Sequence, residues 1–140
     1  SEYPIEHSEF QIHHYWQGTR DVSPFLTIPD AIRFRENYNW EEVSKKCKLR
    51  ILEFKNEIHE IIKNQSLVDC EADKWLGQMY SFQIENEDFT TLKNIFITDY
   101  KIEIPIMRWE NKTLIRVSLN GYNSEENINK LLDVLKKNNY

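Results

Sequence analysis

The most regular hydrophobic pattern in the chain is a long helical one. Apolar residues recur at three- and four-residue spacing from Trp40 to Ile61, with charged residues between them. This spacing predicts one long amphipathic helix, because every third or fourth residue falls on the same helical face. Asn39, followed three residues later by Glu42, is a plausible capping pair at its start.

The segment before this helix has weaker patterns. Alternation of apolar and polar positions over residues 1–15 is partial and predicts an extended segment, in which His13 and His14 point to opposite sides. Ser23 followed by proline has the form of a helix start, with serine as the cap. The apolar stripe that follows predicts a helix over Ser23–Glu36, unless Pro29 marks a second start.

The second half of the chain combines strand and helix patterns. Met79–Ile84 alternates as a half-buried strand does. Isoleucines at 102, 104 and 106 predict a second strand, which Pro105 places at an edge or a bulge. A turn at Asn111-Lys112 then leads to an antiparallel return strand, Leu114–Leu119. In that return strand Arg116 shares a side with Leu114 and Ser118, and the intervening aliphatic residues face the helices.

Two further helices complete the predicted fold. Asp88 is a suitable cap for a helix whose inward face includes Leu92 and Phe96, and a terminal helix opens near Ser124 with acidic residues in its first turn. Residues 67–77 form a connector. Helices followed by strands that are interleaved with helices predict an α+β fold, with a small, mostly antiparallel sheet packed by helices, one of them long.

Size and composition limit the function. A chain of 140 residues is long enough for one compact core. The formal net charge is −5 and the basic residues are scattered, which argues against a nucleic-acid partner. The sequence has neither an apolar run that could span a bilayer nor a signal pattern, so we expect a soluble, cytoplasmic protein with no membrane partner. Cys47 and Cys70 do not form a disulfide framework, and we expect both to be reduced, with no metal bound.

Two short motifs carry candidate chemistry. Gly18 and Thr19, in Trp16-Gln-Gly-Thr-Arg-Asp21, combine a backbone that can turn tightly with a hydroxyl beside exposed N–H groups, which suits a phosphate oxygen and equally suits an ordinary turn. Arg116 lies inside an apolar strand, where its planar guanidinium suits bidentate binding of a carboxylate. It could equally face water or pair with a surface carboxylate.

Together, the segment 15–21 and the segment 115–123 resemble the C-terminal part of class V aminotransferase-like, pyridoxal-phosphate-dependent enzymes. The isopenicillin N epimerase-like branch is the most similar. The motifs occur in the family's order, with Ile104-Pro105-Ile106 between them and a closing helix after them. The resemblance implies the C-terminal small domain of fold type I enzymes.

The resemblance also implies roles for residues. In such enzymes the arginine matched by Arg116, in an Arg-x-Ser-x-x-x-Tyr-Asn motif, binds the α-carboxylate of the amino-acid substrate. The pair matched by Gly18 and Thr19 approaches the cofactor phosphate, typically in the active site of the homodimer partner. Arg20 and Asp21 also match, but without an assigned role; a contact between them that braces the loop is the structural alternative.

The same resemblance predicts what this chain lacks. Residues 1–22 would be the tail end of the large-domain region, and residues 23–140 the small domain with its linking helix. The Schiff-base lysine would lie upstream, so we expect no catalytic residue and no bound pyridoxal phosphate in this chain alone. With Ser1 rather than Met at its start, we expect a fragment of a longer protein.

The sequence is compatible with two functions. In the first, the chain belongs to a pyridoxal-phosphate enzyme that acts on an amino acid, such as an epimerase, although lyase and transaminase chemistry share the same arginine. A desulfurase is disfavoured, because no cysteine lies between Glu71 and Arg116. In the second, the chain is a stand-alone, non-catalytic interaction domain that reuses this fold.

Overall fold

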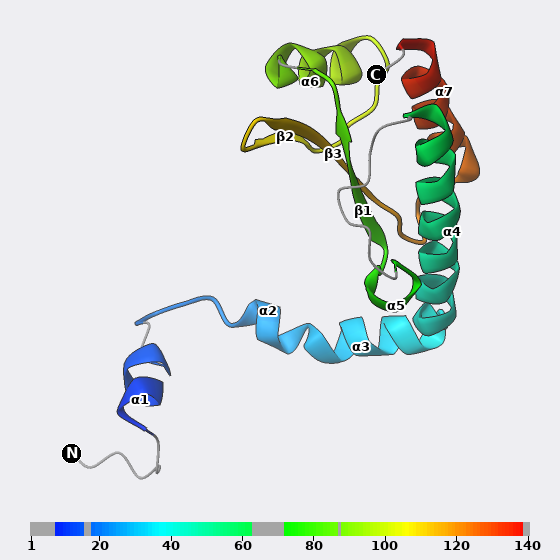
Figure 1. Cartoon of the computed structure of the whole chain (residues 1–140). Helices are drawn as coiled ribbons and strands as arrows, with labels where there is room; N and C mark the ends of the chain where they lie inside the picture. Colours follow the sequence, from blue (N-terminus) through cyan, green and yellow to red (C-terminus); the bar gives the residue numbers. More distant parts are fainter. Residues whose placement is uncertain (1–7, 16–17, 63–71, 87, 139–140) are drawn as a thin grey trace, which may run out of the picture. The chain divides into compact units, whose positions relative to one another are not determined.

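The computed structural model describes residues 8–15, 18–62, 72–86 and 88–138. The chain divides into two compact units, Ser1–Tyr38 and Asn39–Tyr140. The first contains three short helices, α1 (Glu9–Tyr15), α2 (Ser23–Leu26) and α3 (Ile28–Asn37). The second contains the sheet and the remaining helices (Figure 1).

The second unit is built on a three-stranded antiparallel sheet. Its strands are β1 (Met79–Ile84), β2 (Ile106–Trp109) and β3 (Lys112–Ser118), in the order β1-β3-β2. β3 is therefore the middle strand, and its register pairs Ser81 of β1 with Arg116 and Ile106 of β2 with Ile115. The described pairings confirm the predicted α+β fold with a small antiparallel sheet.

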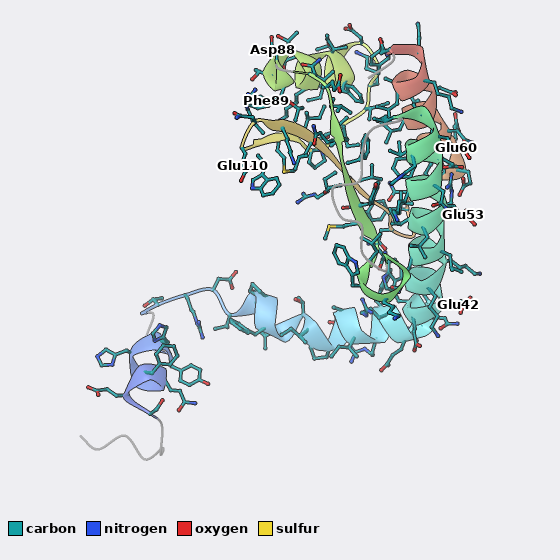
Figure 2. The ribbon with its side chains drawn as sticks, viewed as in Figure 1. Glu42, Glu53, Glu60, Asp88, Phe89 and Glu110 are labelled. Atoms are coloured by element: carbon teal, nitrogen blue, oxygen red, sulfur yellow. The ribbon has the colours of Figure 1, made fainter. Side chains whose placement is uncertain are left out.

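Helices cover one face of this sheet. The long helix α4 (Trp40–Ile61) and the terminal helix α7 (Glu125–Asn138) lie side by side against it, whereas α6 (Phe89–Thr98) contacts β2 (Figure 1). A fourth helix in this unit, α5 (Ala72–Trp75), is a single turn before β1. Figure 2 shows Glu53 and Glu60 on the side of α4 that faces away from the sheet.

The core lies between the sheet and these helices. Its members include Ile51, Phe54 and Ile58 of α4, together with buried residues of each strand and of α6 and α7, among them Phe82, Phe96, Ile115 and Leu135. Burying such side chains supplies the main driving force of folding. The predicted inward faces of α4 and α7 are therefore confirmed, as is the alternation of β1, in which Tyr80, Phe82 and Ile84 are buried.

The prediction of an extended segment was wrong for Glu9–Tyr15, which is helical. A reciprocal pair of bonds starts this helix: the Ser8 N–H donates to Gln11 Oε1 at 2.9 Å, and the Gln11 N–H donates to Ser8 Oγ at 3.3 Å. This is a capping box. The rings of His13 and His14 bind backbone carbonyls one turn earlier, and both side chains are exposed. Residues 1–7 lie outside the described part of the chain.

The helix starts at Ser23 and Trp40 were predicted correctly, but the capping interactions expected there were wrong. Ser23 is the first residue of α2 rather than its cap; its N–H and hydroxyl both donate to Asp21 Oδ1, at 2.9 and 2.6 Å. Asn39 does precede α4, but its side chain makes no capping bond and its backbone is left-handed, with φ of 45°. The alternative of a second start at Pro29 is confirmed, because α3 begins at Ile28.

Two elements begin or end elsewhere than predicted. The strand expected from residue 102 begins only at Ile106, because Pro105 has no N–H to continue the ladder; β2 is nevertheless an edge strand, as predicted. The connector 67–77 contains α5.

The two cysteines differ in what the structure describes. Residues 63–71, including Cys70, lie outside the described residues, whereas Cys47 is a free, half-buried thiol against the core.

No helix in the described ranges is both long enough and apolar enough to cross a membrane. Those ranges likewise contain no group of three or more His, Cys, Asp or Glu side chains arranged to hold a metal ion.

Candidate functional site

Arg116 lies near the centre of the sheet, on the face opposite the core. On either side of it, Ile115 and Val117 are buried at 0% and 6% exposure, whereas Arg116 and Ser118 are exposed. Leu114 shares the face of Arg116, because successive strand residues alternate between faces. The predicted orientation of the arginine is thus confirmed.

The backbone of Arg116 is fixed, while its guanidinium is available. Its N–H donates to the carbonyl of Pro105 at 3.0 Å, and Ser81 lies directly across from it on β1. Within the described residues, no carboxylate lies within ion-pairing distance of the guanidinium. A planar cation without an internal partner can bind an external carboxylate through two parallel hydrogen bonds.

A hollow of about 320 Å³ opens beside Arg116. Its lining includes the polar residues Glu103, Ser118, Tyr122 and Asn123, together with apolar residues of α4 and α7, among them Phe54. A concave site with an apolar floor and a few convergent polar groups is the usual form of a small-molecule site. The hollow therefore has the size and the mixed polar and apolar lining of a small-molecule site, and Arg116 is part of that lining.

The loop from β3 to α7 is held by its own hydrogen bonds. The N–H of Asn120 donates to Asn123 Oδ1 at 2.9 Å, and the N–H of Asn123 donates back to the carbonyl of Asn120 at 2.9 Å. Gly121 passes so close to α4 that a Cβ there would lie 3.0 Å from Val43 Cγ1 and 3.3 Å from the Trp40 ring. The loop that carries Tyr122 is therefore fixed against α4.

An ion-pair network fixes the start of α7 near the same loop. Nε of Arg50 donates to both carboxylate oxygens of Glu125, at 3.0 and 2.9 Å, and its Nη1 donates to Glu57 at 3.0 Å. Burial lowers the pKa of Arg50, but its hydrogen bonds to Glu57 and Glu125 outweigh this effect and raise the pKa above its ordinary value. The network ties α4 to α7 across 75 sequence positions.

Gly18 and Thr19 lie in the first unit and are exposed there. Gly18 has φ of +72°, and among the described residues nothing is recorded within 4 Å of the position that a Cβ would take. The Arg20 guanidinium lies 5.0 Å from the centre of the Phe25 ring, and Asp21 binds Ser23. Arg116 belongs to the second unit, so the two motifs lie in different units of the chain.

Sequence reasoning missed the rim residue Glu103. The signal that could have identified it is the alternation around Pro105, in which Ile104 and Ile106 are buried and Glu103 and Pro105 are exposed. This alternation places Glu103 on the exposed side of the segment that meets Arg116. Glu103 thus lines the same hollow as the predicted arginine.

Comparison with known proteins gave two informative matches, although no family model matches the chain. It is 25% identical over 122 residues to isopenicillin N epimerase of Amycolatopsis lactamdurans, covering 86% of this chain and 30% of that protein. Its fold is similar to the crystal structure of 8-amino-7-oxononanoate synthase from Francisella tularensis, with a TM-score of 0.65 and 19% identity. That match covers 92% of this chain and 37% of the synthase.

The chain spans about a third of the length of each of these proteins. The sequence match agrees with the epimerase-like resemblance, and the structural match agrees with the predicted fold class. The resemblance and the fold class predicted from the sequence are confirmed at this level: the chain is similar in sequence to isopenicillin N epimerase and shares the fold of part of 8-amino-7-oxononanoate synthase.

Proposed function

We propose that this chain is the C-terminal small domain of a pyridoxal-phosphate-dependent enzyme that acts on an amino acid, and that Arg116 binds the substrate's α-carboxylate. The observation that supports this most is the position of Arg116. Arg116 is exposed and belongs to the lining of a hollow, and no described carboxylate pairs with its guanidinium. The match to an epimerase supports an epimerase-like, class V member with isomerase activity.

The Gly18 loop suits the cofactor phosphate. A left-handed glycine turns the backbone so that successive N–H groups can converge on an anion, and the neighbouring Thr19 adds an exposed hydroxyl. We therefore assign Gly18 and Thr19 to phosphate binding, in the active site of a homodimer partner. Residues 1–22 would then belong to the large-domain region and residues 23–140 to the small domain of a cytoplasmic enzyme.

The chemistry would be divided between cofactor and chain. Pyridoxal phosphate, when bound, supplies an electron sink for reactions at the substrate's α-carbon. The part played by this chain is to bind and orient: the flat fork of Arg116 fixes the plane of the carboxylate and hence the position of the α-carbon. The hydrogen-bonded loop at Asn120–Asn123 keeps the rim of the hollow in place beside the arginine.

Arg116→Lys in the enzyme that contains this domain tests the carboxylate role. Lysine keeps the charge and loses the bidentate geometry, which should weaken productive binding by about 1.5–3 kcal/mol, or about ten- to a hundredfold in kcat/KM. Thermal stability should change little, because the residue is exposed. Steady-state kinetics with the amino-acid substrate would measure the loss.

Arg108→Lys is a matched control, since Arg108 is an exposed arginine on the neighbouring strand whose register partner is Thr113 rather than Arg116. Its kcat/KM should stay near that of the wild type. If folded Arg116→Lys keeps the wild-type kcat/KM, Arg116 is an ordinary surface arginine and does not bind the carboxylate.

A second candidate, a non-catalytic interaction domain, is favoured by the first unit. Large apolar side chains there are at least half exposed, among them Phe10, Phe25, Leu26, Ile32 and Phe34. Exposed apolar surface of this extent marks an interaction site. Light scattering combined with affinity capture would test it: a stoichiometric partner protein supports this function, and a chain that stays monomeric and captures none counts against it.

A further inference from the structure

Two side chains of opposite charge line the hollow without pairing with each other. Arg116 and Glu103 are both exposed, and no described nitrogen–oxygen contact within 4.0 Å joins them or joins either one to another charged residue. A guanidinium and a carboxylate at one small site normally stabilise each other through direct, charge-assisted hydrogen bonds. Their separation leaves both charges available to a ligand.

Strand geometry places the two side chains on the same side of the sheet. The bond from the Arg116 N–H to the Pro105 carbonyl continues the β2–β3 pairing by one step. Glu103 lies two residues before Pro105, and the alternating burial of residues 102–106 returns it to the exposed face. Diagonal neighbours in a regular sheet lie about 7–8 Å apart, and Glu103 lies just beyond the N-terminal end of β2 on the line of that strand. That spacing leaves room for a small ligand between the two charged groups.

Tyr122 adds an aromatic ring to the same rim. It is 80% exposed, and within the described residues no ring contact or hydrogen bond engages its side chain. Aromatic faces attract cations, as carboxylates do. The lining of the hollow therefore combines Arg116, which attracts an anion, with Glu103 and Tyr122, which attract a cation.

We propose that Glu103 determines specificity for amino-acid substrates whose side chain ends in a positively charged group, such as an ammonium. This inference rests on the proposed function, because it takes the carboxylate at Arg116 as the fixed point. The ligand's ammonium then lies between the Glu103 carboxylate and the Tyr122 ring. A neutral side chain of equal length would leave Glu103 without a partner.

The test compares binding of L-lysine and L-norleucine to the 140-residue chain, followed by amide NMR shifts of the residues around the hollow. The two ligands have similar length and differ at the terminal ammonium. Since an exposed ion pair contributes modestly, L-lysine should bind about two- to fivefold more tightly than L-norleucine. In Glu103→Gln this ratio should fall to about one, while the affinity for L-norleucine stays unchanged.

Glu110→Gln is the matched control. It removes the same charge from an exposed residue in the β2–β3 turn, at the other end of the hairpin (Figure 2), and should keep the wild-type ratio. Retention of the ratio in Glu110→Gln would exclude a general effect of the chain's negative charge on a cationic ligand.

Arg116→Gln separates this inference from the proposed function, because it should weaken both ligands equally. The role of Glu103 is overturned if the wild type binds both ligands equally, if the affinity ratio persists in Glu103→Gln, or if neither ligand binds. If Arg116→Gln still weakens both ligands, the carboxylate role stands while the specificity role falls. If Arg116→Gln binds both ligands as tightly as the wild type does, Arg116 does not bind the ligand's carboxylate.

Discussion

The two units of this chain bury their apolar residues very differently. In the second unit, α4 and α7 each carry an apolar stripe that packs on the sheet, and side chains such as Phe54 and Leu135 have no exposed surface. In the first unit, α2 and α3 have apolar residues at helical spacing, but none of them is buried. Amphipathic patterning thus predicts a helix in both units, whereas a stable core also requires a partner surface.

The largest expected difference between the units is in the unfolding free energy that is lost when an aromatic side chain is removed. Phe54→Ala in α4 removes a fully buried ring and should lower the free energy of unfolding by about 3–5 kcal/mol. Phe34→Ala in α3 removes a ring that is 50% exposed and should change it by less than about 0.5 kcal/mol. Urea unfolding followed by circular dichroism measures both; equal losses would show that the first unit is covered by a partner in solution.

A smaller contrast concerns the two glycines of the candidate motifs. Gly121→Val places a branched side chain where a Cβ alone would lie 3.0 Å from Val43, and overpacking of this kind costs about 1–3 kcal/mol. Gly18→Val meets no neighbour, but its φ of +72° is strained for a branched residue, so the loss should be local to the loop. Thermal unfolding should show a lower Tm for Gly121→Val and a nearly unchanged one for Gly18→Val.

If Gly18→Val lowered the Tm as much as Gly121→Val did, the first unit would have to unfold cooperatively with the second. Amide NMR spectra of both variants would show where the shifts occur, around α4 and the β3–α7 loop for Gly121→Val and near residue 18 for Gly18→Val.

The smallest expected effect is on two aspartates that act at helix starts. The Asp88 side chain accepts from the Thr91 N–H at 3.0 Å, and hydrogen bonds from Thr91 lower the Asp88 pKa; hydrogen bonds from Ser23 lower the pKa of Asp21. Because both folded-state pKa values lie below the unfolded ones, each contribution is present above about pH 4 and is lost as the pH falls through the lowered value.

Acid titration followed by NMR should therefore show α6 losing stability below pH 4, and Asp88→Asn should reduce that pH dependence. A matching substitution, Asp21→Asn, should affect only the first turn of α2, because no core packs on that helix. A pH dependence unaltered in Asp88→Asn would assign the acid sensitivity to other carboxylates.

Elements that pack on the core could be predicted from the sequence. The α4 and α7 stripes, the β1 alternation and the Asp88 cap are local patterns, and the same alternation gave the correct face for Arg116. The incorrect predictions lie where local signals compete. The capping box at Ser8 and Gln11 starts a helix within a segment whose partial alternation suggests a strand.

Contacts between distant segments could not be predicted. The bond between Arg50 and Glu125 joins residues 75 positions apart, and the approach of Gly121 to α4 depends on how the β3–α7 loop packs. No local pattern encodes such a meeting, because it exists only once the core has formed. The loop beside Arg116 is held by contacts of this kind, so its packing on α4 could not be predicted, although the motif already contained Tyr122 and Asn123.

Pro105 also affects how this domain avoids aggregation. A sheet grows by adding a strand to an exposed edge, and such growth needs a row of free N–H and C=O groups. On the β2 side this row is only four residues long and is preceded by a residue that has no N–H, and the exposed, charged Arg108 lies within it. Intermolecular strand addition is therefore opposed at the β2 edge of the sheet.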